Sequence, residues 1–576
     1  MFDLVIRNGT VVDGTGQPAF TADVGVVAGR IESVSKSPLS AGRQELDAEG
    51  LLVTPGFVDI HTHYDGQATW SNTLSPSSAH GVTTVVMGNC GIGFAPCRPS
   101  DRERLIQLME GVEDIPEVVM TEGLQWNWES FPEYLDAVAA IPHDMDIAAY
   151  VPHSALRVYA MGERGANREP ARPGDLVQMQ TLLREALQHG AMGIATSRTI
   201  VHRTPEGELI PSHDVTEAEL HALAEVLRDE RRGIFQAVMD LDEEGVDEDF
   251  DLLRRVATRS GRPISFSLLQ PLNHPHVWKR MLEKLDEASS AEVPISAQVF
   301  GRPVGMLLGL DLSFHPFSFH PAYMEIASLP LEERVNAMRQ PERRARILAE
   351  QPIDNGLPFL AHLVRFEWMF ELGETPDYQP PLDQSIAAIA AREGSSAQAV
   401  AYDMLLKREG RNVILLPRAN YNDGNLDAAL AMMRHPRTVL GLGDGGAHCG
   451  VICDASLPTF MLTYWARDRA TDGLTIEEAV RALSSETADA VGLHDRGRIM
   501  PGYKADINLI DHAALTLHAP EMVADLPAGG RRLHQPATGY VATIVNGELT
   551  RRNDNATGVF SGRVVRGAQP APSAAA

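Results

Sequence analysis

Apolar and polar positions alternate in short runs at both ends of the chain, a pattern typical of β-strands. Near the N-terminus two such runs flank Asn8-Gly9, a dipeptide that favours a hairpin turn. A similar alternation returns close to the C-terminus, before Asn546-Gly547. Because chain termini often lie close together, we predict that the two ends pair into one small β-sandwich. Its two parts are residues 1–55 and 496–576.

Between the two ends, short apolar runs alternate with amphipathic segments of helical period. Helices are expected, for example, at 175–188 and 217–229. Repeated β-α units predict an α/β fold with a parallel sheet, and eight such units predict a (β/α)8 TIM-like barrel over 56–495. The eight expected strands are 57–61, 83–87, 146–150, 192–195, 234–238, 264–269, 294–299 and 438–442.

The gap between the seventh and eighth predicted strands is too long for one β-α unit. It predicts an insertion around 300–412 with helices of its own, such as 396–407. An insertion at this point of a barrel is placed to act as a lid that excludes water from a bound substrate.

Composition narrows the possible partners and the compartment. The 576 residues carry a formal net charge of −27, which disfavours nucleic acid and anionic membrane surfaces as partners. The N-terminus does not read as a signal peptide, and no apolar run approaches the roughly 18 residues of a spanning helix. Four cysteines do not suggest a disulfide scaffold. We therefore expect a cytoplasmic protein that acts on small molecules, with assembly into a homo-oligomer left open.

The first candidate for chemistry is His61-Thr62-His63, at the end of the first predicted barrel strand. Residues i and i+2 of a strand point to the same face, so the two imidazoles would converge at the carboxyl end, where barrel active sites lie. Imidazole is a favoured ligand of zinc and similar metals. We interpret His61 and His63 as metal ligands.

Asp444 and Cys90 extend this hypothesis. Asp444 follows the last predicted barrel strand, which would place it opposite the histidine pair, where a carboxylate can bind a metal and transfer protons. The alternative is an ordinary Asp-Gly-Gly turn. Cys90 follows the second strand in Gly88-Asn-Cys-Gly, where a thiolate would complete a mixed nitrogen and sulfur site. The alternative is a small packed residue, which is how we interpret Cys97, Cys449 and Cys453.

The sequence resembles the amidohydrolase superfamily, in the branch of the N-acyl-D-amino-acid deacylases, or D-aminoacylases. The resemblance covers nearly the whole chain and is carried by the segments 3–9, 53–63, 88–91, 443–445 and 501–506. It implies a barrel with zinc held partly by a cysteine after strand two, an aspartate base after strand eight, and hydrolysis of an N-acyl amino acid. His61, His63, Cys90 and Asp444 match these positions.

Two metal-binding histidines that the resemblance leads one to expect have no counterpart. Strand five carries Gln236 near the first position, and strand six has Ser267-Leu268 at the second. Because leucine is no ligand and an amide oxygen is a poor zinc ligand, the site is altered or completed from elsewhere. His274, His276, His448, His153 and His202 are the possible substitutes. None of the five lysines falls in strands two to six, which favours one zinc or other divalent metal per chain over a lysine-bridged pair.

Substrate contacts are expected from the loops after strands three, four and eight, at the rim of the barrel. Arginine there can clamp a substrate carboxylate in a bidentate manner. The residues concerned are His153, Arg157, Arg198, His202 and His448. The sequence leaves open three functions: deacylation of an N-acyl D-amino acid by a metal-activated water, hydrolysis of a cyclic imide or another acyl amine, and a non-catalytic scaffold.

Overall fold

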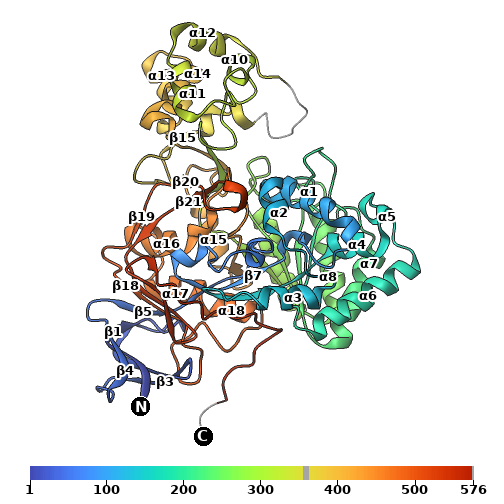
Figure 1. Cartoon of the computed structure of the whole chain (residues 1–576), viewed down its shortest axis with the longest axis vertical. Helices are drawn as coiled ribbons and strands as arrows, with labels where there is room; N and C mark the ends of the chain where they lie inside the picture. Colours follow the sequence, from blue (N-terminus) through green and yellow to red (C-terminus); the bar gives the residue numbers. More distant parts are fainter. Residues whose placement is uncertain (354–361, 574–576) are drawn as a thin grey trace.

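The computed structural model describes residues 1–353 and 362–573, and Figure 1 shows their arrangement. Strands from both ends of the chain form one nine-stranded sheet, ordered β25-β24-β23-β18-β5-β1-β2-β3 with β4 beside β1. The two ends meet where β18 runs antiparallel to β5, with Leu509 opposite Val53. The predicted pairing of the two ends is therefore present. The strands are β1 (Phe2–Val11), β2 (Phe20–Val27), β3 (Arg30–Ser35), β4 (Gly42–Asp47), β5 (Leu52–Pro55), β18 (Ile507–Ile510), β23 (Tyr540–Val545), β24 (Glu548–Arg552) and β25 (Asn555–Ala556).

All eight predicted barrel strands are present as parallel strands, arranged in two sheets. One has the order β6-β7-β8 and the other β17-β13-β12-β11-β10-β9; β8 and β9 are separated by Tyr150 alone. The strand ladders thus do not form the single closed ring that was predicted. The bounds are β6 (Phe57–Asp59), β7 (Val82–Met87), β8 (Asp146–Ala149), β9 (Val151–Pro152), β10 (Gly193–Ser197), β11 (Ile234–Val238), β12 (Ile264–Ser267), β13 (Ile295–Val299) and β17 (Thr438–Leu440).

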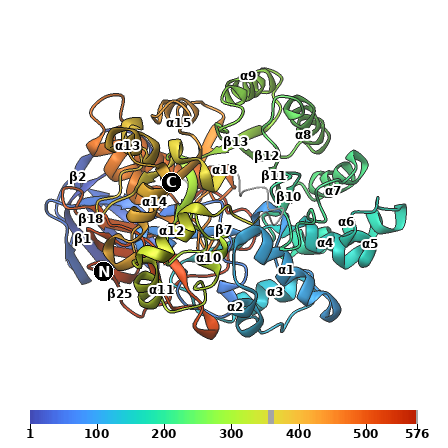
Figure 2. The same cartoon turned by 90° about the horizontal axis from the view of Figure 1, so that it is seen from above.

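Helices cover the outer face of these strands, and Figure 2 shows α6 to α9 as an arc around β10 to β13. Their apolar faces are buried in the main core. Local capping sets where they begin: the Thr216 hydroxyl accepts the N–H of Glu219 at the start of α7. The helices outside the insertion are α1 (Arg102–Glu113), α2 (Glu117–Gly123), α3 (Phe131–Ala139), α4 (His153–Met161), α5 (Glu163–Ala166), α6 (Pro173–Gln188), α7 (Glu217–Glu230), α8 (Val246–Ser260), α9 (Val277–Ser290), α15 (Asp427–Met433), α16 (Leu457–Phe460), α17 (Ile476–Leu483) and α18 (Ser485–Ala490).

The insertion forms a lobe with its own apolar core, at the top of Figure 1. Backbone bonds attach its first part to the loop after Asp444: Leu307 N–H donates to Val451 O (2.7 Å) and Ser313 N–H to Gly450 O (3.1 Å). The part of the prediction that falls on 354–361 lies outside the described residues. The insertion contains β14 (Val304–Leu308), α10 (Pro321–Met324), α11 (Leu331–Met338), α12 (Pro341–Ala349), β15 (Phe370–Glu371), α13 (Ile386–Glu393), α14 (Ala397–Leu405) and β16 (Ile414–Ala419).

The C-terminal part of the chain also contributes two short antiparallel strand pairs, β19 with β22 and β20 with β21. One of them, β20 with β21, reaches the loops that line a pocket beside Asp444. Among the described residues, no helix is both long and apolar enough to span a membrane. The compartment and the oligomeric state stay predictions. The strands are β19 (Thr516–Leu517), β20 (Glu521–Val523), β21 (Arg532–His534) and β22 (Ala537–Thr538).

Candidate metal centre and active site

His61 and His63 follow β6 directly, at the carboxyl end of the first parallel strand. The N–H of Asp444 donates to His61 O (3.0 Å), and the N–H of His63 donates to Gly445 O (2.8 Å). These bonds align the segment after the first strand with the segment after the eighth. Asp444 is therefore a direct neighbour of the histidine pair and not opposite to it as predicted, because the first and eighth strands of a barrel arrangement adjoin.

The side chains of His61, His63 and Cys90 converge in the interior. One ligand atom from each lies within 4.8 Å of the other two, and all three residues are buried. The Nε2 atom of His61 is 3.3 Å from Cys90 Sγ. Asp444 Oδ1 lies 3.6 Å from Nε2 of His61 and 3.7 Å from Nε2 of His63. Four potential ligand atoms of the types that zinc accepts thus face one small volume.

Cys90 is presented by a backbone turn that requires its glycine neighbours. Gly88 and Gly91 have φ of 82° and 72°, and Cys90 itself has φ of 56°. A Cβ on Gly88 would lie 2.4 Å from Tyr150 O, so no larger residue fits there. Gln236 Oε1 accepts the N–H of Cys90 (3.3 Å) and supports the turn. The glycine-rich loop therefore directs the thiol toward His61.

Burial sets the protonation of the cluster. It lowers the pKa of His61 and His63, so both imidazoles are neutral at pH 7 and keep a free lone pair. Burial alone would raise the pKa of Asp444, but interaction with the imidazoles of His63 and His61 outweighs it and holds that pKa below its usual value. Burial and the nearby carboxyl of Glu113 raise the pKa of the Cys90 thiol. Conversion of Cys90 to a thiolate therefore needs a positive charge beside it, such as a metal ion.

Two side chains that the sequence did not single out contact the far nitrogens of the histidines. Gln298 Oε1 is 2.7 Å from Nδ1 of His61, and Gln298 Nε2 donates to Ser265 Oγ (3.1 Å). Glu113 Oε1 is 3.3 Å from Nδ1 of His63. Gln298 could have been singled out from the sequence, because it is a polar residue within a short, mostly apolar strand, β13. Glu113 stands at the end of an ordinary amphipathic helix and gave no such signal.

The positions of the two missing histidines are filled without new metal ligands. Gln236 uses its amide oxygen for the Cys90 N–H, and Leu268 is fully buried in the core. Within residues 1–353 and 362–573, one group of three or more histidine, cysteine, aspartate or glutamate residues is close enough to hold a metal. It consists of His61, His63 and Cys90. His274 and His276 are not part of it, so their predicted role as substitutes is not supported.

The five predicted substrate contacts separate into two groups. His153 Nε2 is 2.9 Å from Glu219 Oε1, and Arg157 is 1% exposed and forms an ion pair with the same carboxylate. This pairing keeps both in the interior, so the geometry does not support a role for them in binding a substrate. Arg198 Nε lies 3.4 Å from Asp249 Oδ1, and its Nη1 donates to Val215 O (3.1 Å), so part of its guanidinium is engaged within the protein.

His202 and His448 lie near the cluster. Burial lowers the pKa of His202 to about 3, and electrostatic interaction with His63, His448 and His61 acts in the same direction. The ring of His202 is held by the hydroxyl of Ser197 (2.8 Å). His448 Nε2 is 3.5 Å from Glu113 Oε2. These two histidines remain candidates for contacts with a substrate.

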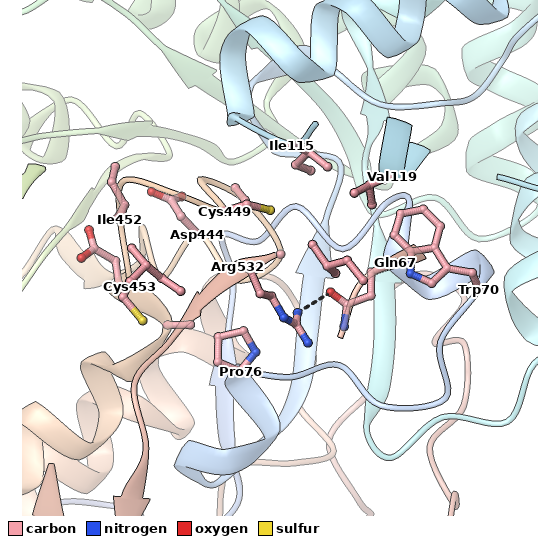
Figure 3. A pocket seen from close by; sticks show the side chains of 16 residues that line it. Gln67, Trp70, Pro76, Ile115, Val119, Asp444, Cys449, Ile452, Cys453 and Arg532 are labelled. Carbon is pink, nitrogen blue, oxygen red and sulfur yellow. Dashed lines mark hydrogen bonds between the residues drawn. The ribbon is translucent and has the colours of Figure 1, made fainter. Parts of the chain in front are cut away.

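A pocket adjoins Asp444, and Figure 3 shows its lining. Apolar side chains from four parts of the chain contribute to its wall. They are Trp70, Ile115, Val119, Ile452, Leu526 and Leu533. Arg532 points into it and donates to Gln67 Oε1 (2.9 Å), while Asp525 pairs with its other nitrogens.

Parallel strands that carry a His-X-His pair, a thiol and an aspartate at their carboxyl ends are typical of metal-dependent α/β hydrolases. The chain belongs to the amidohydrolase family, whose model matches residues 44–551. It is similar to D-aminoacylase of Alcaligenes xylosoxydans xylosoxydans, with 36% identity over 34% of this chain and 37% of that protein. The resemblance to the D-aminoacylase branch is confirmed.

Two further likenesses extend over the whole chain. An uncharacterized protein of Mycobacterium tuberculosis (strain ATCC 25618 / H37Rv) is 28% identical over 99% of this chain and 92% of its own length. A solved structure of D-aminoacylase superposes with a TM-score of 0.65 at 24% identity, covering 98% of this chain and 100% of that one. The second likeness shows a shared fold.

Proposed function

We propose that this enzyme hydrolyses the amide bond of an N-acyl amino acid, with the D enantiomer as its preferred substrate. The observation that carries the proposal is the convergence of the two histidine Nε2 atoms, Cys90 Sγ and Asp444 Oδ1 at the carboxyl ends of the parallel strands. The choice of D-amino acid is supported by the similarity to D-aminoacylase. The domain limits 1–55, 56–495 and 496–576 are part of the same proposal.

The donor set fits one zinc ion per chain. Two neutral imidazoles and a thiol, buried and within 4.8 Å of one another, offer the nitrogen and sulfur ligands that zinc accepts. His61, His63 and Cys90 would hold it, with Asp444 as the fourth ligand. Bound zinc would polarise the scissile carbonyl and make a water molecule more acidic. The related D-aminoacylase is described as having a binuclear centre with one-metal activation and second-metal attenuation, which agrees with a single productive site.

Asp444 is the proposed general base and acid. Its pKa lies below the usual value, so the carboxylate is ionised at neutral pH and can accept a proton from the attacking water. It then passes this proton to the departing nitrogen, which leaves as a neutral amine. The side chain is 18% exposed, so a substrate can reach it from the pocket side.

The surroundings suggest how a substrate would lie. The apolar wall beside Asp444 suits an acyl chain or an apolar amino-acid side chain. His202 and His448 would contact the polar part of the substrate, near the scissile bond. Attachment of the insertion to the loop after Asp444 supports a role for this lobe in limiting the entry of water.

A substrate panel tests the proposal. The zinc-loaded protein should release amine from N-acetyl-D-amino acids with kcat/KM at least about tenfold above that for the L enantiomers, as expected where one pocket shape separates two stereoisomers. Amine release is measured by a chromogenic reaction, with hydantoin and dihydrouracil as cyclic competitors. Ring opening of the cyclic compounds without deacylation would contradict the proposal and favour an imide hydrolase.

A further inference from the structure

Glu113 is the last residue of α1 and lies behind the histidine pair. The helix ends there because Asp114 adopts a left-handed conformation with φ of 51°. The end of the helix holds the loop after Asp444: Cys449 N–H donates to Asp114 O (3.2 Å), Gly450 N–H donates to Asp114 Oδ2 (3.0 Å), and His448 N–H donates to Glu113 O. Glu113 is thus fixed between two segments that carry candidate site residues.

The carboxyl group of Glu113 contacts one histidine from each segment. Its Oε1 lies 3.3 Å from Nδ1 of His63, and its Oε2 lies 3.5 Å from Nε2 of His448. The residue is 1% exposed. In the described part of the chain neither Glu113 Oε1 nor His63 Nδ1 has a well-formed hydrogen bond, although the two atoms face each other. A small rotation of either side chain would complete a bond from Nδ1–H to Oε1.

Burial of this carboxyl group is not explained by an ion pair with arginine or lysine. Within the described residues, the ion pairs of Glu113 are with His63 and His448 alone. Glu219, a second buried glutamate, is by contrast paired with Arg157 and His153. A buried carboxyl without such a cation lowers stability, so folding alone does not explain its position. The contacts of this carboxyl group with His63 and His448 indicate its role.

We infer that Glu113 is a positioning residue for the metal ligand His63. By accepting a hydrogen bond from Nδ1–H, it keeps the proton on that nitrogen and leaves the Nε2 lone pair directed toward Asp444 and the metal position. Gln298 performs the same task for His61 through its amide oxygen. This inference rests on the proposed function, because it concerns the same metal centre.

Zinc affinity, measured by competition with a chromophoric chelator, tests the inference. Glu113→Gln keeps the size of the side chain but weakens the acceptor, and we expect zinc affinity to fall about 10–100-fold. Glu113→Asp should recover part of the loss, because it restores a carboxyl at a shorter reach. Glu103→Gln, an exposed charge removal on the same helix, should bind zinc as the wild type does. The metal-free Glu113→Gln protein should unfold at the wild-type temperature or above, which separates positioning from a structural role.

The outcomes distinguish failure of the positioning role of Glu113 from failure of the proposed function. Equal zinc affinity in wild type and Glu113→Gln would overturn the positioning role and leave the proposed function intact. A metal-free Glu113→Gln protein that unfolds well below the wild type would also overturn it, in favour of a structural role. Absence of zinc binding by the wild type itself would overturn both.

Discussion

Replacement of Asp444 by asparagine is expected to lower kcat for N-acyl amino-acid hydrolysis by about 10²–10⁴-fold, the range typical of a lost general acid–base group. Asparagine cannot accept the proton from the attacking water or return it to the nitrogen. KM should change little, because the apolar wall that would hold the substrate is formed by other residues. Steady-state kinetics with an N-acetyl-D-amino acid measure the effect, with zinc content determined on the same sample.

A matched control is Asp136→Asn, which removes an exposed carboxylate whose partner is Arg566. Its kcat should equal that of the wild type, because surface ion pairs contribute little. If Asp444→Asn with full zinc content retains wild-type kcat, another group transfers the protons, and the assignment of Asp444 fails.

The second large effect concerns stability. Asp146 on β8 is fully buried and connects the parallel strands with the terminal sheet: it pairs with Arg496 (2.8 Å) and Lys504, and accepts from Asn546 Nδ2 (2.9 Å). Asp146→Asn would remove the buried negative charge that Arg496 and Lys504 share, and leave them with Asp495 (2.9 Å) and Asp506 (3.6 Å). We expect the free energy of unfolding to fall by about 3–5 kcal/mol, as for other broken buried ion pairs. Urea denaturation of both proteins at pH 7 measures the difference.

The ion pairs of Asp146 with Arg496 and Lys504 also predict that stability depends on pH. Although burial opposes it, Lys504 and Arg496 hold the pKa of Asp146 at about 2, below the ordinary 3.8. Because the folded-state pKa lies below the unfolded one, the stabilisation is complete above 3.8 and is lost as the pH falls through about 2. The difference between wild type and Asp146→Asn should shrink over this range. Asp489→Asn, which breaks the more exposed pair with Arg498, should cost less than about 1 kcal/mol; an equal cost for both would contradict the account.

The parallel strands were predictable because each is a short apolar run bounded by turns and helices. The prediction of strands near 234–238 and 295–299, for example, required no knowledge of distant contacts. The histidine pair was equally readable, because its two-residue spacing places both rings on one face. The pairing of the two chain ends followed from a shared pattern, and the structure shows the register through β5 and β18.

Contacts between distant segments could not be predicted in this way. Glu113 and Gln298 contact histidines 50 and 237 residues away in sequence, and no local pattern shows which histidine either side chain contacts. Arg157 follows a parallel strand, and for this reason we expected its side chain at the rim of the site. It instead forms a buried ion pair with Glu219 of a different helix. The arrangement of the parallel strands in two sheets also could not be predicted from the sequence, because it depends on the interruption at Tyr150 between β8 and β9.

The central claim is that His61, His63 and Cys90 hold a metal, and metal content per chain tests it most directly. Protein purified without chelator is compared with His61→Ala by elemental analysis. The account predicts about one zinc per wild-type chain and its loss from the variant, since one of three converging ligands is removed. A wild-type chain that holds no zinc and takes none up when zinc is added would contradict the account.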